Sequence, residues 1–219
     1  MSNGISIVKG ILWVLVWFGF MIFYTVLDIL IWRKIAPEQS RFLNLITVAI
    51  CMAIFLNLLV TKTNFKLRLF SNISFLGIVL ALGCSVLFYF LLDKGLDPLF
   101  EDLFPSSKEN YQQIIRLIQI SPIVSFFDFC ILAPILEEVL MRGFLLDGLS
   151  INYGKIVALL ISAAFFSILH FNIAQIVPSF ICGILLGLLY FYTDSIFSCI
   201  LAHMGYNAIS YIMIILSKL

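Results

Sequence analysis

The segment Ala133-Pro-Ile-Leu-Glu-Glu-Val-Leu-Met-Arg142 places two adjacent carboxylates and an arginine in an otherwise apolar run. An ionised side chain at bilayer depth costs about 3 kcal/mol or more, so it usually faces a partner or a water-filled cavity. On a helix, Glu138 and Arg142 share a face and can form an internal ion pair. Glu137 points about 100° away and has no partner in its own helix. The segment therefore predicts one neutralised carboxylate and one that is free for another task.

The composition is typical of a protein that crosses a membrane several times. Of 219 residues, 63% are hydrophobic and 11% are charged, and the mean hydropathy is +1.13. A soluble domain has about 25% charged residues. The formal net charge is +1, and no basic stripe alternates with aromatic residues, which argues against a nucleic-acid partner. The cysteines form no Cys-x-x-Cys pair and are expected to be small buried hydrophobes: Cys51, Cys84, Cys130, Cys182 and Cys199.

Seven segments have, or nearly have, the roughly 20 apolar residues that a membrane span needs. They are residues 11–32, 43–60, 70–92, 122–146, 156–172, 174–192 and 196–216. The stretch from Asp93 to Ser121 is acidic at first and then amphipathic, which predicts a short helix at the membrane interface. The predicted fold is all-α: a polytopic transmembrane helical bundle of about seven helices, with a short interfacial helix before the fourth span.

Prolines and glycines mark two special places in the predicted spans. Pro134 lies one turn before Glu137, and Pro178 lies early in the sixth span. Each proline removes a backbone hydrogen bond and tends to kink its helix. A kink beside a buried carboxylate is where a membrane protein can admit water. Gly183 and Gly187 form a Gly-x-x-x-Gly pair, which is typical of close helix packing.

Few polar side chains remain inside the predicted spans: Asp28, Asp128, Glu137, Glu138, Arg142, His170, His203 and Asn207. We expect Asp28 and Asp128 to form hydrogen bonds between helices. Helical rise, counted from the 147–155 loop, places Glu137 roughly 20 Å deep and His170 roughly 22 Å deep. The same count gives roughly 12 and 18 Å for His203 and Asn207. Each of these four alone would more simply be packing between helices, but their shared depth predicts that they meet.

These four groups are suited to peptide hydrolysis without a protein nucleophile. A carboxylate in a medium of low dielectric is a stronger base than in water, and with a histidine it can deprotonate a water molecule. A second histidine and an amide N–H can stabilise an oxyanion. Alternatively, Glu137, His170 and His203 could hold Zn²⁺ with one open position. No His-Glu-x-x-His motif occurs, so the residue types leave both mechanisms open.

Three motifs on successive apolar segments resemble one family of intramembrane proteases. They are Glu-Glu-x-x-x-Arg (137, 138, 142), Phe-x-x-x-His (166, 170) and His-x-x-x-Asn (203, 207). Together they are similar to the CAAX prenyl protease and bacteriocin-processing (CPBP, or Abi) family, which includes the Ras-converting CAAX endopeptidase. The resemblance implies that Glu137 and His170 activate water while His203 and Asn207 stabilise the oxyanion. It gives Glu138, Arg142 and Phe166 supporting roles.

The resemblance favours a glutamate-type mechanism without a cofactor, with zinc as the alternative. It implies a multi-pass endopeptidase of the cell membrane, surrounded by lipid, that cuts a membrane-associated or lipidated peptide. Many bacterial members are linked instead to peptide maturation or bacteriocin self-immunity. We expect one integral-membrane domain over residues 1–219, with a catalytic core at about 122–216 and accessory helices at about 11–92.

A non-catalytic function is the rival interpretation. The chain would then be a bacteriocin-immunity or scaffold partner of a membrane sensor, or a proton-coupled carrier that uses Glu137 and the histidines as a proton relay. Inverted repeats with paired broken helices, which many carriers have, are not evident in the sequence.

Overall fold

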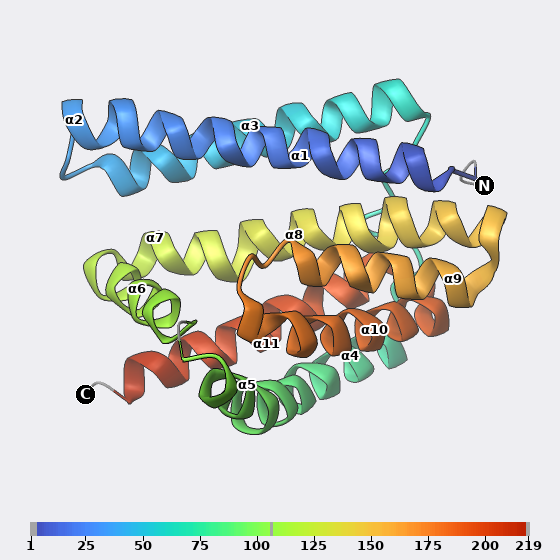
Figure 1. The fold of residues 1–219 in the computed structure, drawn as a ribbon. Coiled ribbons are helices and arrows are strands. Elements are labelled where there is room, and N and C mark those ends of the chain that lie inside the picture. The colour runs from blue at the N-terminus through green and yellow to red at the C-terminus, as the bar shows by residue number, and fades with distance from the viewer. Residues whose placement is uncertain (1–3, 106, 218–219) are drawn as a thin grey trace.

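The computed structural model describes residues 4–105 and 107–217, and all the regular structure in these ranges is helical (Figure 1). The first two long helices lie side by side along one face of the bundle. The first long helix is continuous and comprises α1 (Ile7–Leu27), the π-turn η1 (Asp28–Trp32) and α2 (Arg33–Ile35). The second, α3 (Ser40–Thr63), runs antiparallel to it. They pack through aromatic rings, with Trp13, Trp17 and Phe20 arranged around the fully buried Phe55.

A third long helix lies on the opposite face of the bundle and extends further than predicted. It comprises α4 (Phe75–Phe88), the π-turn η2 (Tyr89–Leu96) and α5 (Asp97–Leu103). The predicted span 70–92 was therefore wrong at its end, because Asp93 and Asp97 continue the helix instead of starting a loop. A separate helix, α6 (Ser107–Ile120), forms the short element predicted before the fourth span.

The centre of the bundle is a helical rod that begins at Pro122 and runs to Gly154. Its parts are α7 (Pro122–Phe127), η3 (Asp128–Leu132), α8 (Ala133–Glu138), η4 (Val139–Leu146) and the first part of α9 (Asp147–Ile168). Every residue of η4 is buried. Gly154 has φ 78° and ψ 161°, a conformation that interrupts the helix and that glycine adopts without strain. The remainder of α9 therefore turns back along the rod.

The last part of the chain packs closely against this rod. It comprises η5 (Ile173–Gln175), α10 (Ile176–Thr193) and α11 (Ile196–Leu216). A Cβ atom at Gly183 would lie 3.0 Å from the Cα of Ala163, and one at Gly187 would collide with Leu159. The close packing predicted from the Gly-x-x-x-Gly pair is thus confirmed between α10 and α9.

Five helices in the described ranges are long and apolar enough to cross a membrane: Ile7–Ile35, Ser40–Thr63, Phe75–Leu103, Ile173–Thr193 and Ile196–Leu216. The other two predicted spans, 122–146 and 156–172, are also helical for most of their length. The first contains four charged residues, and the second is shortened because α9 ends at Ile168. The all-α, polytopic architecture is confirmed.

Candidate active site

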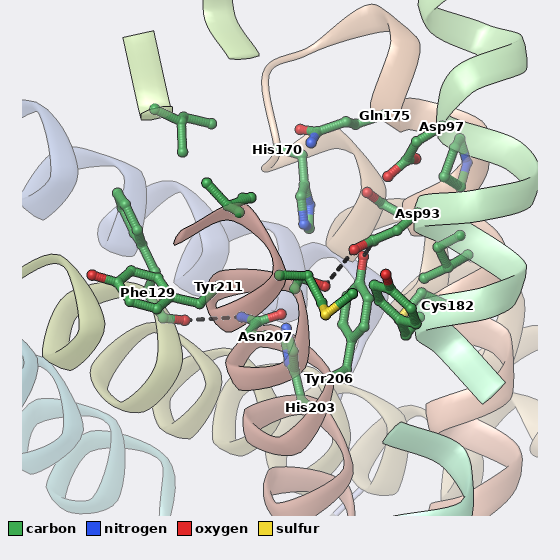
Figure 2. A pocket seen from close by; sticks show the side chains of 18 of the residues that line it. Asp93, Asp97, Phe129, His170, Gln175, Cys182, His203, Tyr206, Asn207 and Tyr211 are labelled. Carbon is green, nitrogen blue, oxygen red and sulfur yellow. Dashed lines mark hydrogen bonds between the residues drawn. The ribbon is translucent and has the colours of Figure 1, made fainter. Parts of the chain in front are cut away.

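A cavity of about 590 Å³ opens between the rod, α10, α11 and the long helix that contains Asp93. Glu137 lines this cavity from α8. His170 lines it from the turn after α9, and His203 and Asn207 line it from α11 (Figure 2). The structure therefore brings together the four residues that the sequence placed at one depth. The cavity also places these polar groups where a substrate can reach them.

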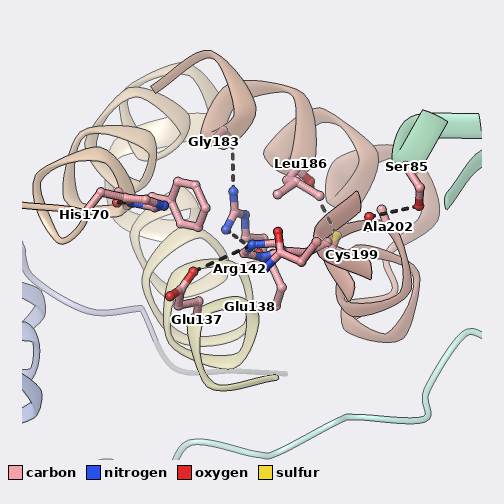
Figure 3. A network of polar contacts seen from close by, with 12 residues as sticks. Ser85, Glu137, Glu138, Arg142, His170, Gly183, Leu186, Cys199 and Ala202 are labelled. Carbon is pink, nitrogen blue, oxygen red and sulfur yellow. Dashed lines mark hydrogen bonds and ion pairs between the residues drawn. The ribbon is translucent and has the colours of Figure 1, made fainter. Parts of the chain in front are cut away.

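The two adjacent glutamates have opposite environments (Figure 3). The side chains of Glu138 and Arg142 are 0% exposed, and their Oε1 and Nη1 atoms lie 2.8 Å apart, which confirms the predicted ion pair. Arg142 Nη2 also donates to the carbonyl oxygen of Gly183 at 3.1 Å. Glu137, in contrast, keeps 30% of its side chain exposed at the cavity. One carboxylate is thus fixed inside the bundle while its neighbour is accessible.

His203 lies between these two carboxylates. Its Nδ1 is 2.9 Å from Glu138 Oε1, and its Nε2 is 3.9 Å from Glu137 Oε2. Because an ionised carboxylate only accepts hydrogen bonds, Nδ1 carries a proton and donates to Glu138. A second proton, on Nε2, would give an imidazolium that donates an N–H into the cavity. The sequence predicted the pair of Glu138 with Arg142 but not this second contact of Glu138.

His170 is oriented by the backbone of its own turn. Its Nδ1 lies 2.8 Å from the carbonyl oxygen of Phe166 and donates to it, which leaves Nε2 of the neutral ring as an acceptor. The Phe166 ring contacts both imidazoles, with centroids 4.9 Å from His170 and 5.6 Å from His203. The guanidinium carbon of Arg142 lies 4.6 Å from the centroid of the same ring. Phe166 is therefore packed against both histidines and the buried arginine.

Asn207 is held by the rod on the other side of the cavity. Its Nδ2 donates to the backbone carbonyl of Phe129 at 2.9 Å (Figure 2). An amide nitrogen has two hydrogens, so one N–H of Asn207 is left for a group in the cavity.

A carboxylate beyond the end of the predicted span 70–92 also lines the cavity. Asp93 accepts hydrogen bonds from the hydroxyls of Tyr206, at 2.6 Å, and Ser210, both on α11 (Figure 2). Asp97 lies one turn further on and lines the same cavity. A sequence signal for these carboxylates was available in the four-residue spacing of Asp93, Asp97 and Glu101. This spacing places all three on one face of a helix that continues past residue 92.

Both aspartates that were expected to bond between helices lie outside the candidate site. Asp28 pairs with Arg33 at 2.7 Å inside its own continuous helix, so the prediction of a contact between helices was wrong for Asp28. Asp128 is absent from the residues that line the cavity. Neither aspartate contributes to the candidate site.

The proposed zinc ligands do not form a metal-binding group in this arrangement. Within residues 4–105 and 107–217, no three His, Cys, Asp or Glu side chains are placed to hold a metal ion. Nδ1 of His203 contacts Glu138 and Nδ1 of His170 contacts a backbone carbonyl, so each ring keeps its Nε2 for a group in the cavity. The mechanism proposed below therefore uses the protein side chains alone.

Comparison with known proteins gives one match. Residues 119–209 match the family model described as type II CAAX prenyl endopeptidase Rce1-like. No curated protein and no solved structure matches the chain. The matched range contains all three motifs, from Glu137 to Asn207, and it excludes α1, α3 and the long helix Phe75–Leu103.

Proposed function

Since residues 119–209 match the type II CAAX prenyl endopeptidase Rce1-like family model, we propose that the protein hydrolyses a peptide bond in a membrane-associated substrate. The observation that carries the proposal is the single cavity shared by Glu137, His170, His203 and Asn207. The neutralisation of Glu138 by Arg142 leaves Glu137 as the base of this set. The catalytic core would comprise residues 122–216.

In the proposed mechanism, Glu137 and Nε2 of His170 hold a water molecule between them. Glu137 takes a proton from the water as its oxygen attacks the carbonyl carbon of the scissile bond. The resulting oxyanion accepts hydrogen bonds from the free N–H of Asn207 and from Nε2–H of protonated His203. Glu137 then gives its proton to the amide nitrogen, and the C–N bond breaks to release an amine and a carboxylic acid.

Glu138 would support this chemistry without touching the substrate. Its Oε1 accepts from His203 Nδ1, so it fixes the ring and stabilises the imidazolium that the oxyanion needs. Arg142 holds Glu138 in place through their ion pair. Carboxylate, imidazole and guanidinium thus form one chain of charged contacts behind the cavity.

We propose a membrane-associated or lipidated peptide as the substrate, since the cavity lies among helices that are long and apolar enough to cross a membrane. Peptide maturation or bacteriocin self-immunity in a bacterial cell membrane is a biological setting in which such a cut would be used. Offering the same peptides with and without a prenyl group would show whether lipid is recognised.

The direct test is cleavage of a library of amphipathic and lipidated peptides by the protein purified in detergent. Glu137→Gln and His170→Ala should reduce cleavage by a factor of about 100 or more, because each removes a group that activates water. Glu109→Gln, which makes the same chemical change at an exposed position of α6, should cleave like the wild type. Equal cleavage by the wild type, Glu137→Gln and His170→Ala would refute the proposal.

The mechanism without a metal has its own test. Activity should persist after dialysis against a strong chelator, because the protein side chains alone activate the water. Loss of activity on chelation, with recovery on addition of Zn²⁺, would contradict the mechanism while leaving the endopeptidase activity in place.

A further inference from the structure

The hydrogen bond that holds Asn207 ends on a backbone carbonyl inside the rod. Phe129 lies in the middle of the rod, where a helical carbonyl normally accepts from the backbone N–H four residues later. Its carbonyl instead accepts from the side chain of another helix, at 2.9 Å. A helical carbonyl has two lone pairs and can bind a side chain in addition to its backbone donor, as Gly183 does with Arg142, but without a backbone donor it depends on the side chain alone.

Two local features remove that donor. In the π-turn η3, the N–H of Ala133 donates to the carbonyl of Asp128, five residues back. The same spacing would pair Phe129 with residue 134, but this residue is a proline and has no N–H. The Phe129 carbonyl therefore lacks a donor within the rod and accepts from Asn207 Nδ2.

We propose that Pro134 is a positioning residue for Asn207, and this inference rests on the proposed function. By leaving the Phe129 carbonyl without a donor, Pro134 creates the acceptor that fixes the carboxamide. A carbonyl cannot accept from Oδ1, so the amide is held with Nδ2 toward Phe129 and its second N–H toward the cavity. Pro134 is buried and is not among the residues that line the cavity.

The proposal makes a thermodynamic prediction that does not depend on activity. Pro134→Ala supplies an N–H that competes with Asn207 for the Phe129 carbonyl. In the wild-type background, Asn207→Ala leaves that carbonyl without a donor and should lower the Tm clearly. In the Pro134→Ala background the carbonyl is paired within the rod, so Asn207→Ala should lower the Tm less. An equal loss of Tm in both backgrounds would overturn the proposal.

The catalytic prediction follows from the freed carboxamide. Pro134→Ala should lower kcat by about 10- to 100-fold, because an oxyanion donor displaced by about 1 Å stabilises the transition state poorly. KM should be unchanged, since Pro134 does not line the cavity. In an Asn207→Ala background, Pro134→Ala should have no further effect on kcat. An unchanged kcat in Pro134→Ala would contradict the proposal.

Two controls distinguish the effect of the missing N–H on kcat from the effect of the proline ring. Pro122→Ala makes the same change in the first turn of α7, where an N–H has no helical acceptor to pair with, and should leave kcat unchanged. An alanine analogue with an ester in place of the amide at position 134 again lacks the N–H. This variant, made by translation in vitro, should recover wild-type kcat; failure to recover would assign the effect to the ring and overturn the proposal.

The design also separates failure of the inference from failure of the proposed function. If the wild type cleaves no peptide, the endopeptidase proposal fails, while the Tm comparison still decides whether Pro134 positions Asn207. If the wild type cleaves, Glu137→Gln is inactive and Pro134→Ala is as active as the wild type, only the inference about Pro134 fails.

Discussion

The N-terminal pair α1–α3 and the rod from Pro122 to Gly154 are stabilised in different ways. The pair packs through rings, with Phe55 fully buried and the centroids of Trp13, Trp17 and Phe20 between 5.2 and 6.1 Å from its own. The rod instead buries two charges, each held by directional contacts with α10 or α11. Apolar packing tolerates substitutions that keep volume, whereas a buried ion pair loses much when one member is removed.

The largest difference in the free energy of unfolding is expected within the rod itself, between variants of its two glutamates. Glu138→Ala should lower the free energy of unfolding by about 3–5 kcal/mol, because it leaves the fully buried Arg142 without its carboxylate. Glu137→Ala should change it by less than about 1 kcal/mol, since this side chain is partly exposed and has no close ion pair. Denaturant titration in detergent measures both. Similar losses for the two variants would contradict the division of roles between them.

The sequence was sufficient to predict the ion pair of Glu138 with Arg142, because both residues lie on one helix. A four-residue spacing determines that Glu138 and Arg142 share a face, whatever the rest of the chain does. The contact between Glu138 and His203 depends on how α8 and α11 cross, which no spacing within one segment encodes. The convergence of Glu137, His170, His203 and Asn207 was predicted from depth alone, because helical rise is constant and a bilayer has two faces.

The long helix Phe75–Leu103 shows where prediction from the sequence was insufficient. Hydropathy located its apolar part, but Asp93 and Asp97 were placed beyond the end of the predicted span. In the structure, Asp93 is satisfied by hydroxyls from α11, more than a hundred residues later in the chain. A local pattern does not contain that partner. The π-turn that frees the Phe129 carbonyl was missed for the same reason, although Pro134 had been identified as a kink.

The contact between α10 and α9 should be the next most sensitive feature. Gly183→Ala places a Cβ atom 3.0 Å from the backbone of Ala163, so the helices must separate, and we expect a loss of about 1–3 kcal/mol. Gly19→Ala in α1 is the matched control, because nothing lies within 4 Å of its Cβ position. This change should stabilise by up to about 1 kcal/mol. The same denaturant titration tests both, and equal effects would contradict the close packing.

The aromatic cluster of the N-terminal pair should affect stability without affecting catalysis. Phe55→Leu removes ring contacts with three neighbours and should lower the free energy of unfolding by about 1–2 kcal/mol. The kcat and KM of the folded protein should equal those of the wild type, because Phe55 does not line the cavity. A fall in kcat at temperatures well below the Tm would show that this pair takes part in the reaction.

The smallest effect is expected where the long helix meets α11. Tyr206→Phe removes one of the two hydroxyls that Asp93 accepts from and should lower the free energy of unfolding by about 1 kcal/mol. Tyr192→Phe, at a side chain that is 71% exposed, should change it by less than about 0.5 kcal/mol.

Ser210→Ala alone should resemble Tyr206→Phe, since Asp93 then keeps the other hydroxyl. The double variant leaves both oxygens of the carboxylate without these donors, so its loss should exceed the sum of the two single losses. Strictly additive losses would mean that the two hydroxyls act independently, and that Asp93 does not join the long helix to the helix that carries His203 and Asn207.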